Sequence, residues 1–257
     1  MSQTGVHHAS PYLPVLRAPA ELASLRRLLT GKPARPVHLD GFLPAGQAAR
    51  LAGALRAMPR WTRSPVLWDD ALLETTPVAL EEFRDAPSRR RAAVRQVAQD
   101  IPKLFDDGST FPAGHRAALS DFFVFAGMGP VLVDLLAQWI APGAPITTNV
   151  EFARYGTDDY LGEHSDTGSD TLFVLNLYLD EAYKQSDGGV LGFRNEEGEE
   201  FLMPARYNSL SVMPIRRGCV HWVSPWRRDS VGRHTVSIAA TPTADRDETA
   251  EKAVRHA

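Results

Sequence analysis

The sequence predicts an α+β protein in which a mostly helical N-terminal half supports a C-terminal antiparallel β-sandwich or barrel. Two observations carry this prediction. Apolar residues recur at helical spacing in the first 146 residues, whereas short β-branched and aromatic runs separated by turn clusters follow them. Eight such short runs favour an antiparallel sandwich or barrel over parallel βαβ units, because parallel strands need helical crossovers between them.

The bulk composition is that of a globular protein with one large core. The 257 residues are 44% hydrophobic and 23% charged, which suits a single domain with a loose lead-in at 1–20 and a polar tail at 242–257. The formal net charge of −3 argues against a protein built to neutralise phosphates, so we expect no nucleic-acid partner. Cys219 is the only cysteine, and no apolar run has membrane-spanning length. We therefore expect a cytoplasmic protein without a membrane partner, and its oligomeric state stays open.

The first elements are expected to be a helix, a short strand and a second helix. Leucines at helical spacing predict a helix over 21–29, which Gly31 and Pro33 end. Residues 36–44 are typical of a short strand that enters a turn. The next helix is expected over 45–58, with its apolar residues on one face.

The following segments complete a mostly helical support over 21–146. Residues 61–77 contain two tryptophans and two prolines, and we expect them to be irregular. Residues 88–105 are basic with spaced apolar positions, which favours a surface helix that Pro102 ends or kinks. A proline in the first turn and an apolar stripe predict another helix over 130–140.

The strand-rich half, residues 147–241, is expected to form the core and to hold the functional site. One run, 171–180, is almost continuously apolar, which is typical of a central strand buried on both faces. The eight strands are expected over 147–155, 160–164, 171–180, 189–194, 199–203, 208–213, 218–224 and 233–241.

A His-x-Asp pair in this half suggests a metal site. His164 and Asp166 lie two residues apart at the end of a predicted strand, and side chains at this spacing point to the same side. With His221 from a later strand they would form the two-histidine, one-carboxylate face that suits non-haem Fe(II) and leaves positions open. A second pair, His38 and Asp40, adjoins turn residues, and a structural role is favoured there.

These residues also carry a resemblance to a known family. The order Tyr155-Gly156, His164-Ser-Asp166, Tyr178-Leu-Asp180, Asp187-Gly-Gly-Val-Leu191, His221 and Arg233-x-x-x-Ser237 resembles Fe(II)/2-oxoglutarate-dependent dioxygenases of the prolyl 4-hydroxylase-like group. The similarity covers about residues 147–241, and residues 38–58 resemble the strand and helix that precede the core in that group. The resemblance implies a double-stranded β-helix, the jelly-roll or cupin-like fold.

The resemblance also implies roles for individual residues. Arg233 would pair with the distal carboxylate of the cosubstrate 2-oxoglutarate, because a guanidinium fork binds a carboxylate through two hydrogen bonds. Arg227 and Arg228 are the alternatives close by in sequence. O₂ would be the second cosubstrate, with ascorbate as a candidate reductant. The Fe(II) ligands and catalytic centre would be His164, Asp166 and His221, and the other cosubstrate-binding residues Tyr178, Ser237 and Tyr155.

The activity that the resemblance implies is oxidation of a substrate coupled to conversion of 2-oxoglutarate to succinate and CO₂. Related halogenases lack the carboxylate ligand, so Asp166 favours hydroxylation or desaturation. The expected partner is a small-molecule substrate, such as an amino acid or a natural-product intermediate. Hydroxylation of a protein or peptide residue is the first alternative. A non-catalytic, cupin-like metal-binding or sensor protein is the second.

Candidate substrate residues follow from strand alternation. If Tyr155 faces the cavity, then Glu151 and Asn149 on the same strand should face it too. A carboxylate directed into a cavity is costly unless it is paired, so these two residues could bind a polar substrate such as an amine. It is equally consistent with the sequence that Glu151 pairs with a neighbouring Arg154 or Arg206.

Overall fold

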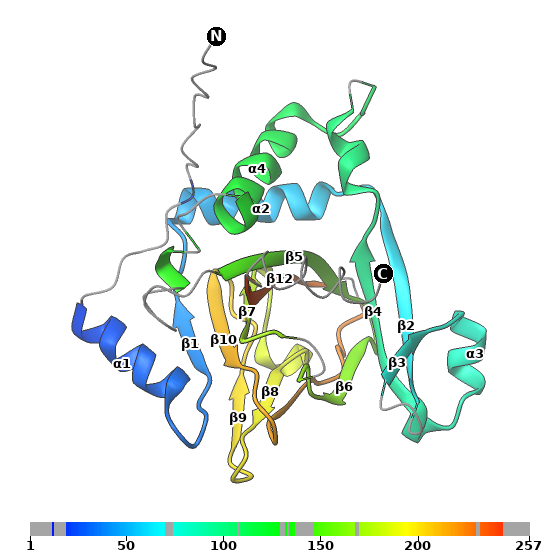
Figure 1. Cartoon of the computed structure of the whole chain (residues 1–257). Coiled ribbons are helices and arrows are strands. Elements are labelled where there is room, and N and C mark those ends of the chain that lie inside the picture. Colours follow the sequence, from blue (N-terminus) through cyan, green and yellow to red (C-terminus); the bar gives the residue numbers. More distant parts are fainter. Residues whose placement is uncertain are drawn as a thin grey trace, which may run out of the picture.

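The structure, a computed structural model, describes residue 12 and residues 19–69, 74–106, 108–128, 132, 134–136, 146–167, 170–229 and 232–243. Within these residues twelve strands form one sheet that curls into a nearly closed barrel, with helices packed against its outside (Figure 1). No helix in this part of the chain combines the length and apolarity needed to cross a membrane.

The N-terminal half contains strands as well as helices. Pro44 precedes α2, where its fixed backbone angle suits the start of a helix. Three short 3₁₀ or π segments, η1 to η3, link longer elements. In chain order the elements are α1 (Pro19–Thr30), β1 (Val37–Asp40), α2 (Ala45–Ala57), β2 (Trp61–Asp69), β3 (Glu74–Pro77), α3 (Leu80–Asp85), η1 (Ser88–Arg90), β4 (Arg91–Ala98), η2 (Ile101–Phe105), α4 (Ala113–Phe123) and η3 (Val124–Met128).

The C-terminal half contains the eight strands that the sequence predicts, with ends that differ by a few residues. They are β5 (Ile146–Tyr155), β6 (Tyr160–His164), β7 (Phe173–Tyr178), β8 (Leu191–Arg194), β9 (Glu200–Met203), β10 (Ser209–Pro214), β11 (Val220–Val223) and β12 (Gly232–Pro242), with a 3₁₀ turn, η4 (Gln185–Asp187), before β8.

The strands form two facing walls of an antiparallel barrel. One wall has the order β1-β10-β7-β12-β5, and the other has the order β6-β11-β8-β9. Strand β4 joins the walls, because it pairs with β5 on one side and with β6 on the other. The fold is therefore a double-stranded β-helix, as predicted.

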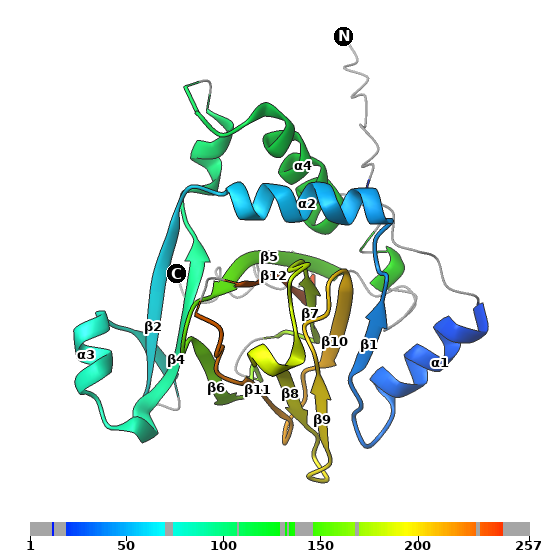
Figure 2. The same ribbon diagram turned by 180° about the vertical axis from the view of Figure 1, so that it is seen from behind.

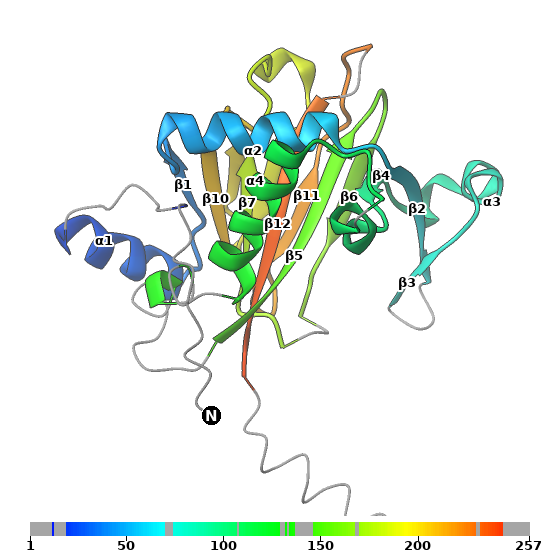
Figure 3. The same cartoon turned by 90° about the horizontal axis from the view of Figure 1, so that it is seen from above.

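The first wall separates an apolar core from a cavity. Along β7 every residue is buried, with Leu175 and Leu177 in the main core and Val174 and Tyr178 in a second cluster on the opposite face. Helices α2 and α4 lie across the outer face of this wall (Figures 2 and 3) and complete the main core. The helical layer holds the wall in place, so its inner face can carry polar side chains.

Two predictions for the N-terminal half are wrong. Of residues 88–105, the central part, 91–98, forms β4 between two 3₁₀ turns rather than a surface helix. Residues 61–69 and 74–77 form the paired strands β2 and β3 rather than an irregular segment. Helix α4 was not predicted. The support over 21–146 is thus a mixture of helices and strands. Strand β4 lies between β5 and β6 and pairs with both, and these backbone hydrogen bonds outweigh the local preference of its residues for a helix.

Three further predictions lie mainly outside the described residues. Of the helix expected over 130–140, residues 132 and 134–136 are described, and they are helical. Nearly all of the lead-in at 1–20 and most of the tail at 242–257 are not described.

His234 makes the stability of the fold sensitive to acid. Its side chain is buried against Trp61, with ring centroids 5.9 Å apart, and burial lowers the pKa of His234 to about 4. Because an unfolded histidine takes up a proton near its ordinary pKa, stability is retained above that value and falls as the pH drops from 6.5 towards 4. We expect this residue to cost about 3 kcal/mol over that interval. Urea unfolding of wild type and His234→Phe at pH 7, 5.5 and 4.5 measures it, and equal pH slopes would contradict it.

Candidate metal centre

The structure brings together the three predicted metal ligands. Strands β6 and β11 pair so that His164 lies opposite His221, and Asp166 follows two residues after the end of β6. Nε2 of His164 lies 3.6 Å from one Asp166 oxygen, and Nε2 of His221 lies 3.4 Å from the other. One ligand atom from each residue lies within 4.8 Å of the other two. This donor set could hold one metal ion on a single face.

The imidazole of His164 is oriented by its own strand. Its Nδ1 lies 2.9 Å from the carbonyl oxygen of Gly162, so Nδ1 carries the proton and donates it, leaving the lone pair on Nε2 for a metal. A Cβ at Gly162 would lie 2.7 Å from the carbonyl oxygen of Ala92 on β4. Glycine therefore allows β6 to approach β4 closely where the first ligand is set.

The environment of His221 favours its neutral form. The residue is only 5% exposed, and burial, followed by the neighbouring His164, holds the pKa of His221 well below its usual range. A neutral imidazole is the form that binds a metal, because a protonated ring has no lone pair to donate.

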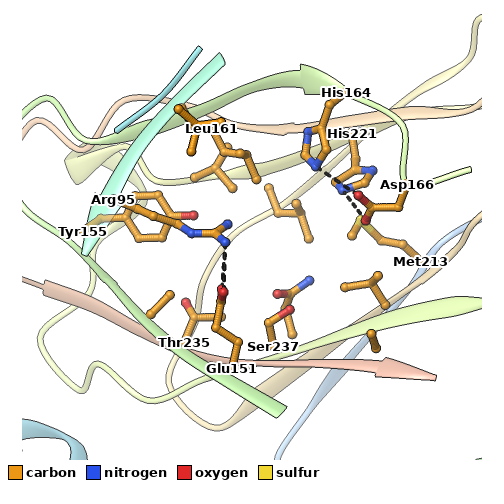
Figure 4. A pocket seen from close by; sticks show the side chains of 18 of the residues that line it. Arg95, Glu151, Tyr155, Leu161, His164, Asp166, Met213, His221, Thr235 and Ser237 are labelled. Carbon is orange, nitrogen blue, oxygen red and sulfur yellow. Dashed lines mark hydrogen bonds and ion pairs between the residues drawn. The ribbon is translucent and has the colours of Figure 1, made fainter. Parts of the chain in front are cut away.

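The three residues face a cavity of about 340 Å³ between the two walls of the barrel (Figure 4). Its lining is apolar beside the metal ligands and more polar along the first wall. The lining residues on the two walls and on β2 and β4 are Val66, Ala92, Ala93, Arg95, Asn149, Glu151, Ala153, Tyr155, Leu161, His164, Asp166, Val174, Asn176, Leu191, Met213, His221, Val223, Arg233, Thr235, Ser237 and Ala239.

Arg233 supplies a buried cation to this cavity. It is 2% exposed, its Nε donates to the carbonyl of Gly189, and its Nη1 lies 3.2 Å from Oγ1 of Thr235. Within the described residues no carboxylate lies within ion-pair distance of this guanidinium, and Nη2 donates no hydrogen bond. A buried guanidinium without a carboxylate is a costly arrangement, and an anionic ligand would relieve it.

The backbone at Arg233 is held in an unusual conformation. Its φ of 48° is left-handed, which L-residues rarely adopt, and Oδ2 of Asp180 accepts its backbone N–H at 3.0 Å. The alternatives Arg227 and Arg228 are exposed, and neither lines the cavity. Among the three arginines, Arg233 is therefore the one available to a ligand in the cavity.

The other predicted cosubstrate residues, Tyr155, Tyr178 and Ser237, differ in whether they contact Arg233 and whether they line the cavity. The guanidinium stacks 4.5 Å from the ring centre of Tyr155 and 5.2 Å from that of Tyr178. Ser237 lines the cavity, whereas Tyr178 lies behind Arg233 and does not. Burial raises the pKa of Tyr178 to about 12, so its hydroxyl remains a donor. That hydroxyl is buried near Ser211 without a well-formed hydrogen bond.

The predicted substrate residues also face the cavity, as strand alternation requires. Asn149 and Glu151 line it together with Tyr155. Glu151 is paired, but with neither expected arginine: its Oε1 lies 2.8 Å from Nη2 of Arg95 on β4. Arg154 instead donates to Gln96 and stacks on Trp61, and Arg206 pairs with Asp40.

Three polar cavity residues, Arg95, Asn176 and Thr235, were not predicted from the sequence. The sequence pattern places Arg95 on a surface helix, and only the pairing of β4 with both walls reveals its position. Asn176 is the single polar residue inside the apolar run of β7, and this interruption of a buried strand was the available signal. The pair His38 and Asp40 forms no metal-ligand group with any other described residue.

Comparison with known proteins identifies the fold. Neither a family model nor a curated protein matches the sequence. Solved structures do match: a prolyl 4-hydroxylase from Pseudomonas putida superposes with a TM-score of 0.57 at 19% identity, covering 86% of this chain and 99% of that one. An oxidoreductase of the 2OG-Fe(II) oxygenase family from Burkholderia pseudomallei gives a TM-score of 0.58 at 16% identity, with coverages of 91% and 98%.

A third matching structure is an epimerase. SnoN, a non-haem α-ketoglutarate-dependent epimerase of nogalamycin biosynthesis, gives a TM-score of 0.56 at 16% identity, with coverages of 88% and 84%. The chain has the fold of the 2-oxoglutarate–Fe(II) oxygenases. The resemblance noted in the sequence is thus confirmed at the level of this oxygenase fold, and the assignment of chemistry depends on the site itself.

Gly189 allows Arg233 to occupy its place in this oxygenase fold. A Cβ at Gly189 would lie 2.6 Å from Cδ of Arg233 and 3.0 Å from Cε3 of Trp226, and φ at this glycine is 62°. We expect Gly189→Ala to displace the guanidinium and to weaken binding of an anionic ligand, with 2-oxoglutarate as the probe, by about 10-fold or more, the effect of losing a charged hydrogen bond. Calorimetric titration of 2-oxoglutarate into the metal-loaded protein measures this.

The matched control is Gly198→Ala. Gly198 also has a positive φ, 84°, but a Cβ there would meet nothing within 4 Å. It therefore imposes a similar backbone strain without touching the cavity. Equal loss of 2-oxoglutarate affinity in both variants would show that the contact with Arg233 is not the cause.

Proposed function

We propose that the protein is an Fe(II)- and 2-oxoglutarate-dependent oxygenase that hydroxylates a small molecule, such as an amino acid or a natural-product intermediate. One observation carries this proposal. Two imidazoles and one carboxylate converge on one side of a cavity that also contains a buried guanidinium with no carboxylate partner among the described residues. The first set fits a divalent metal, and the guanidinium fits the distal carboxylate of 2-oxoglutarate.

The cavity residues would bind the metal and the cosubstrate. His164 and His221 would each donate Nε2 to the iron, and Asp166 would donate a carboxylate oxygen. When bound, Fe(II) would supply the oxidising chemistry, in which O₂ places one oxygen atom in the product and one in succinate while 2-oxoglutarate loses CO₂. Arg233 would hold the distal carboxylate of 2-oxoglutarate through Nη2.

The remaining lining would orient the cosubstrate and exclude water. Thr235 and Gly189 fix the guanidinium of Arg233 through hydrogen bonds, so that less conformational entropy is lost when an anion binds. Apolar side chains beside the metal ligands, including Leu161, Leu191 and Val223, would keep bulk water from the reacting centre.

The size of the cavity supports a small substrate. Its volume of about 340 Å³ is near the lower end for ligand pockets, and cosubstrate and substrate would share it. Related folds serve both classes: one matching structure from Trichoplax adhaerens is a prolyl hydroxylase in complex with a peptide fragment, whereas SnoN acts in nogalamycin biosynthesis. Hydroxylation of a peptide residue is therefore the alternative, and SnoN shows that epimerisation occurs on this fold.

Succinate release tests the proposal. Protein incubated with Fe(II), 2-oxoglutarate, O₂ and ascorbate is expected to form succinate even without substrate, at a slow uncoupled rate. Isotopically labelled O₂ should place one labelled atom in each succinate. The control omits Fe(II), or adds a chelator, and should abolish the reaction. Binding of metal and 2-oxoglutarate without succinate formation would instead indicate a cupin-like binding or sensor protein.

A further inference from the structure

Arg95 and Glu151 form a charged pair on the cavity wall that the proposed chemistry does not use. Nη2 of Arg95 lies 2.8 Å from Oε1 and 3.1 Å from Oε2 of Glu151. The two side chains are 28% and 42% exposed, so both retain accessible surface where they line the cavity. Figure 4 shows the pair across the cavity from His164, His221 and Asp166.

Glu151, the acidic member of the pair, belongs to a different layer of the wall from Arg233. Thr235, which accepts from Arg233, lies in register with Ala153 and Tyr178. Glu151 is one layer further along β5, where Ser237 on β12 is its cross-strand neighbour and Asn176 on β7 is in turn the neighbour of Ser237. Layers on one face of a strand are about 7 Å apart. A cosubstrate held by Arg233 would therefore leave this second layer available to another molecule.

The second layer has hydrogen-bonding capacity left over. Asn176 is 9% exposed, and neither its side-chain amide nor the hydroxyl of Ser237 forms a hydrogen bond to another described residue. Glu151 engages Nη2 of Arg95 and Tyr155 lies against the same guanidinium, which has five N–H donors in all. These polar groups line the cavity and have hydrogen-bonding capacity that a polar ligand could use.

Stability alone does not account for the pair. An ion pair that keeps this much contact with solvent contributes about 0–1 kcal/mol to stability, and its two side chains occupy space in a small cavity. Ala153, between Glu151 and Tyr155 on the same face of β5, is small enough for Arg95 to extend along the strand to Glu151. The arrangement presents one positive and one negative group, side by side, to the cavity.

We propose that Arg95 and Glu151 recognise the zwitterionic head group of a free α-amino acid, an inference that rests on the proposed oxygenase function. Arg95 would bind the α-carboxylate, Glu151 the α-ammonium, and Ser237 and Asn176 would add hydrogen bonds. Adjacent opposite charges complement a zwitterion without leaving either group of the pair unpaired. A residue inside a peptide chain carries no such charges at its backbone, so the pair discriminates against peptides.

The experiment uses the whole protein loaded with Mn(II) and 2-oxoglutarate without O₂. Each of the twenty common L-amino acids is tested for binding by saturation-transfer NMR, beside its N-acetyl amide, which lacks both charges. Succinate release with Fe(II) and O₂ is then measured for each compound. At least one free amino acid should bind and raise succinate release above the uncoupled rate, while its N-acetyl amide should do neither.

Single substitutions separate the two charges. Glu151→Gln should weaken binding of the amino acid by about 10-fold or more, yet change binding of the analogue without the amino group much less. Arg95→Gln should likewise weaken binding of the amino acid by about 10-fold or more. It should change binding of the corresponding amine, which lacks the carboxylate, much less. The controls are Arg35→Gln and Glu200→Gln, which lose charges from exposed ion pairs that do not line the cavity and should leave affinity unchanged.

The possible failures are distinguishable. If 2-oxoglutarate binds the Mn(II)-loaded protein but no free amino acid binds, the zwitterion site is wrong and the oxygenase proposal stands. Equal binding of free amino acids and their N-acetyl amides would also overturn the zwitterion site. So would a loss of thermal stability alone, without a loss of amino-acid affinity, in Glu151→Gln and Arg95→Gln. If 2-oxoglutarate itself fails to bind, the oxygenase proposal fails.

Discussion

Asp166→Asn is expected to lower the affinity for Fe(II) by more than about 100-fold and to abolish succinate formation. Loss of groups that only support a metal ligand costs about 10–100-fold, so loss of the anionic ligand itself should cost more. Asparagine has nearly the same shape as aspartate, and Asp166 is about one-third exposed, so the fold should tolerate the change. Anaerobic calorimetric titration with Fe(II) measures the effect.

The control for this variant is Asp170→Asn, which removes an exposed carboxylate four residues further along the chain. It should bind Fe(II) as tightly as wild type. If Asp166→Asn binds equally well, Asp166 does not ligate the metal, and the proposed centre is wrong.

Arg233→Gln is expected to weaken 2-oxoglutarate binding by about 30-fold or more while Fe(II) still binds. Truncating one partner of a buried charge pair costs about 2–5 kcal/mol, and the lower bound corresponds to that factor. Arg233→Lys should recover only part of the affinity, because an ammonium lacks the planar fork that binds a carboxylate through two hydrogen bonds. The KM for 2-oxoglutarate in the uncoupled reaction, with the Kd from calorimetry, measures both variants.

Arg154→Gln is the matched control for Arg233. Arg154 also stacks on an aromatic ring, that of Trp61 at 4.6 Å, but its side chain does not line the cavity. Its loss should leave the affinity for 2-oxoglutarate within about twofold of wild type, a difference of only a few tenths of a kcal/mol. An unchanged affinity in Arg233→Gln would exclude Arg233 from cosubstrate binding.

The strand-rich half could be predicted because its local signals agree with its tertiary environment. Turn clusters separate the runs, and alternation along β5 correctly places Glu151 and Tyr155 on the cavity face. The His-x-Asp spacing likewise follows from strand geometry, since residues two apart on an extended chain share a side. Local rules therefore predict the His164 and Asp166 ligands, and a second histidine from another strand has to be assumed to complete the set.

The N-terminal half could not be predicted in the same way. In β4 the apolar residues Ala92, Val94 and Val97 are compatible with helical or extended periodicity, and basic residues between them favour a solvated helix. The decisive interaction is non-local: β4 pairs with β2, β5 and β6. Because Arg95 reaches the cavity only in that arrangement, the partner of Glu151 was missed as well.

The position of Arg233 depends on contacts distant in sequence. Its left-handed backbone is held by Asp180, and its guanidinium passes close to Gly189, which has no side chain. The order of the motifs could suggest Arg233 as a ligand-binding residue. Only the structure shows that, among the described residues, no carboxylate forms an ion pair with its guanidinium. That absence of a partner gives the site its capacity for an anion.

The most direct test of the proposed centre is the dependence of 2-oxoglutarate binding on the metal. Calorimetric titration of 2-oxoglutarate into the Mn(II)-loaded protein should show one equivalent bound, with the affinity lost when Mn(II) is removed and weakened by Arg233→Gln. Identical binding with and without Mn(II), or no binding to the loaded protein, would contradict a single cavity in which metal and guanidinium hold the two ends of the same molecule.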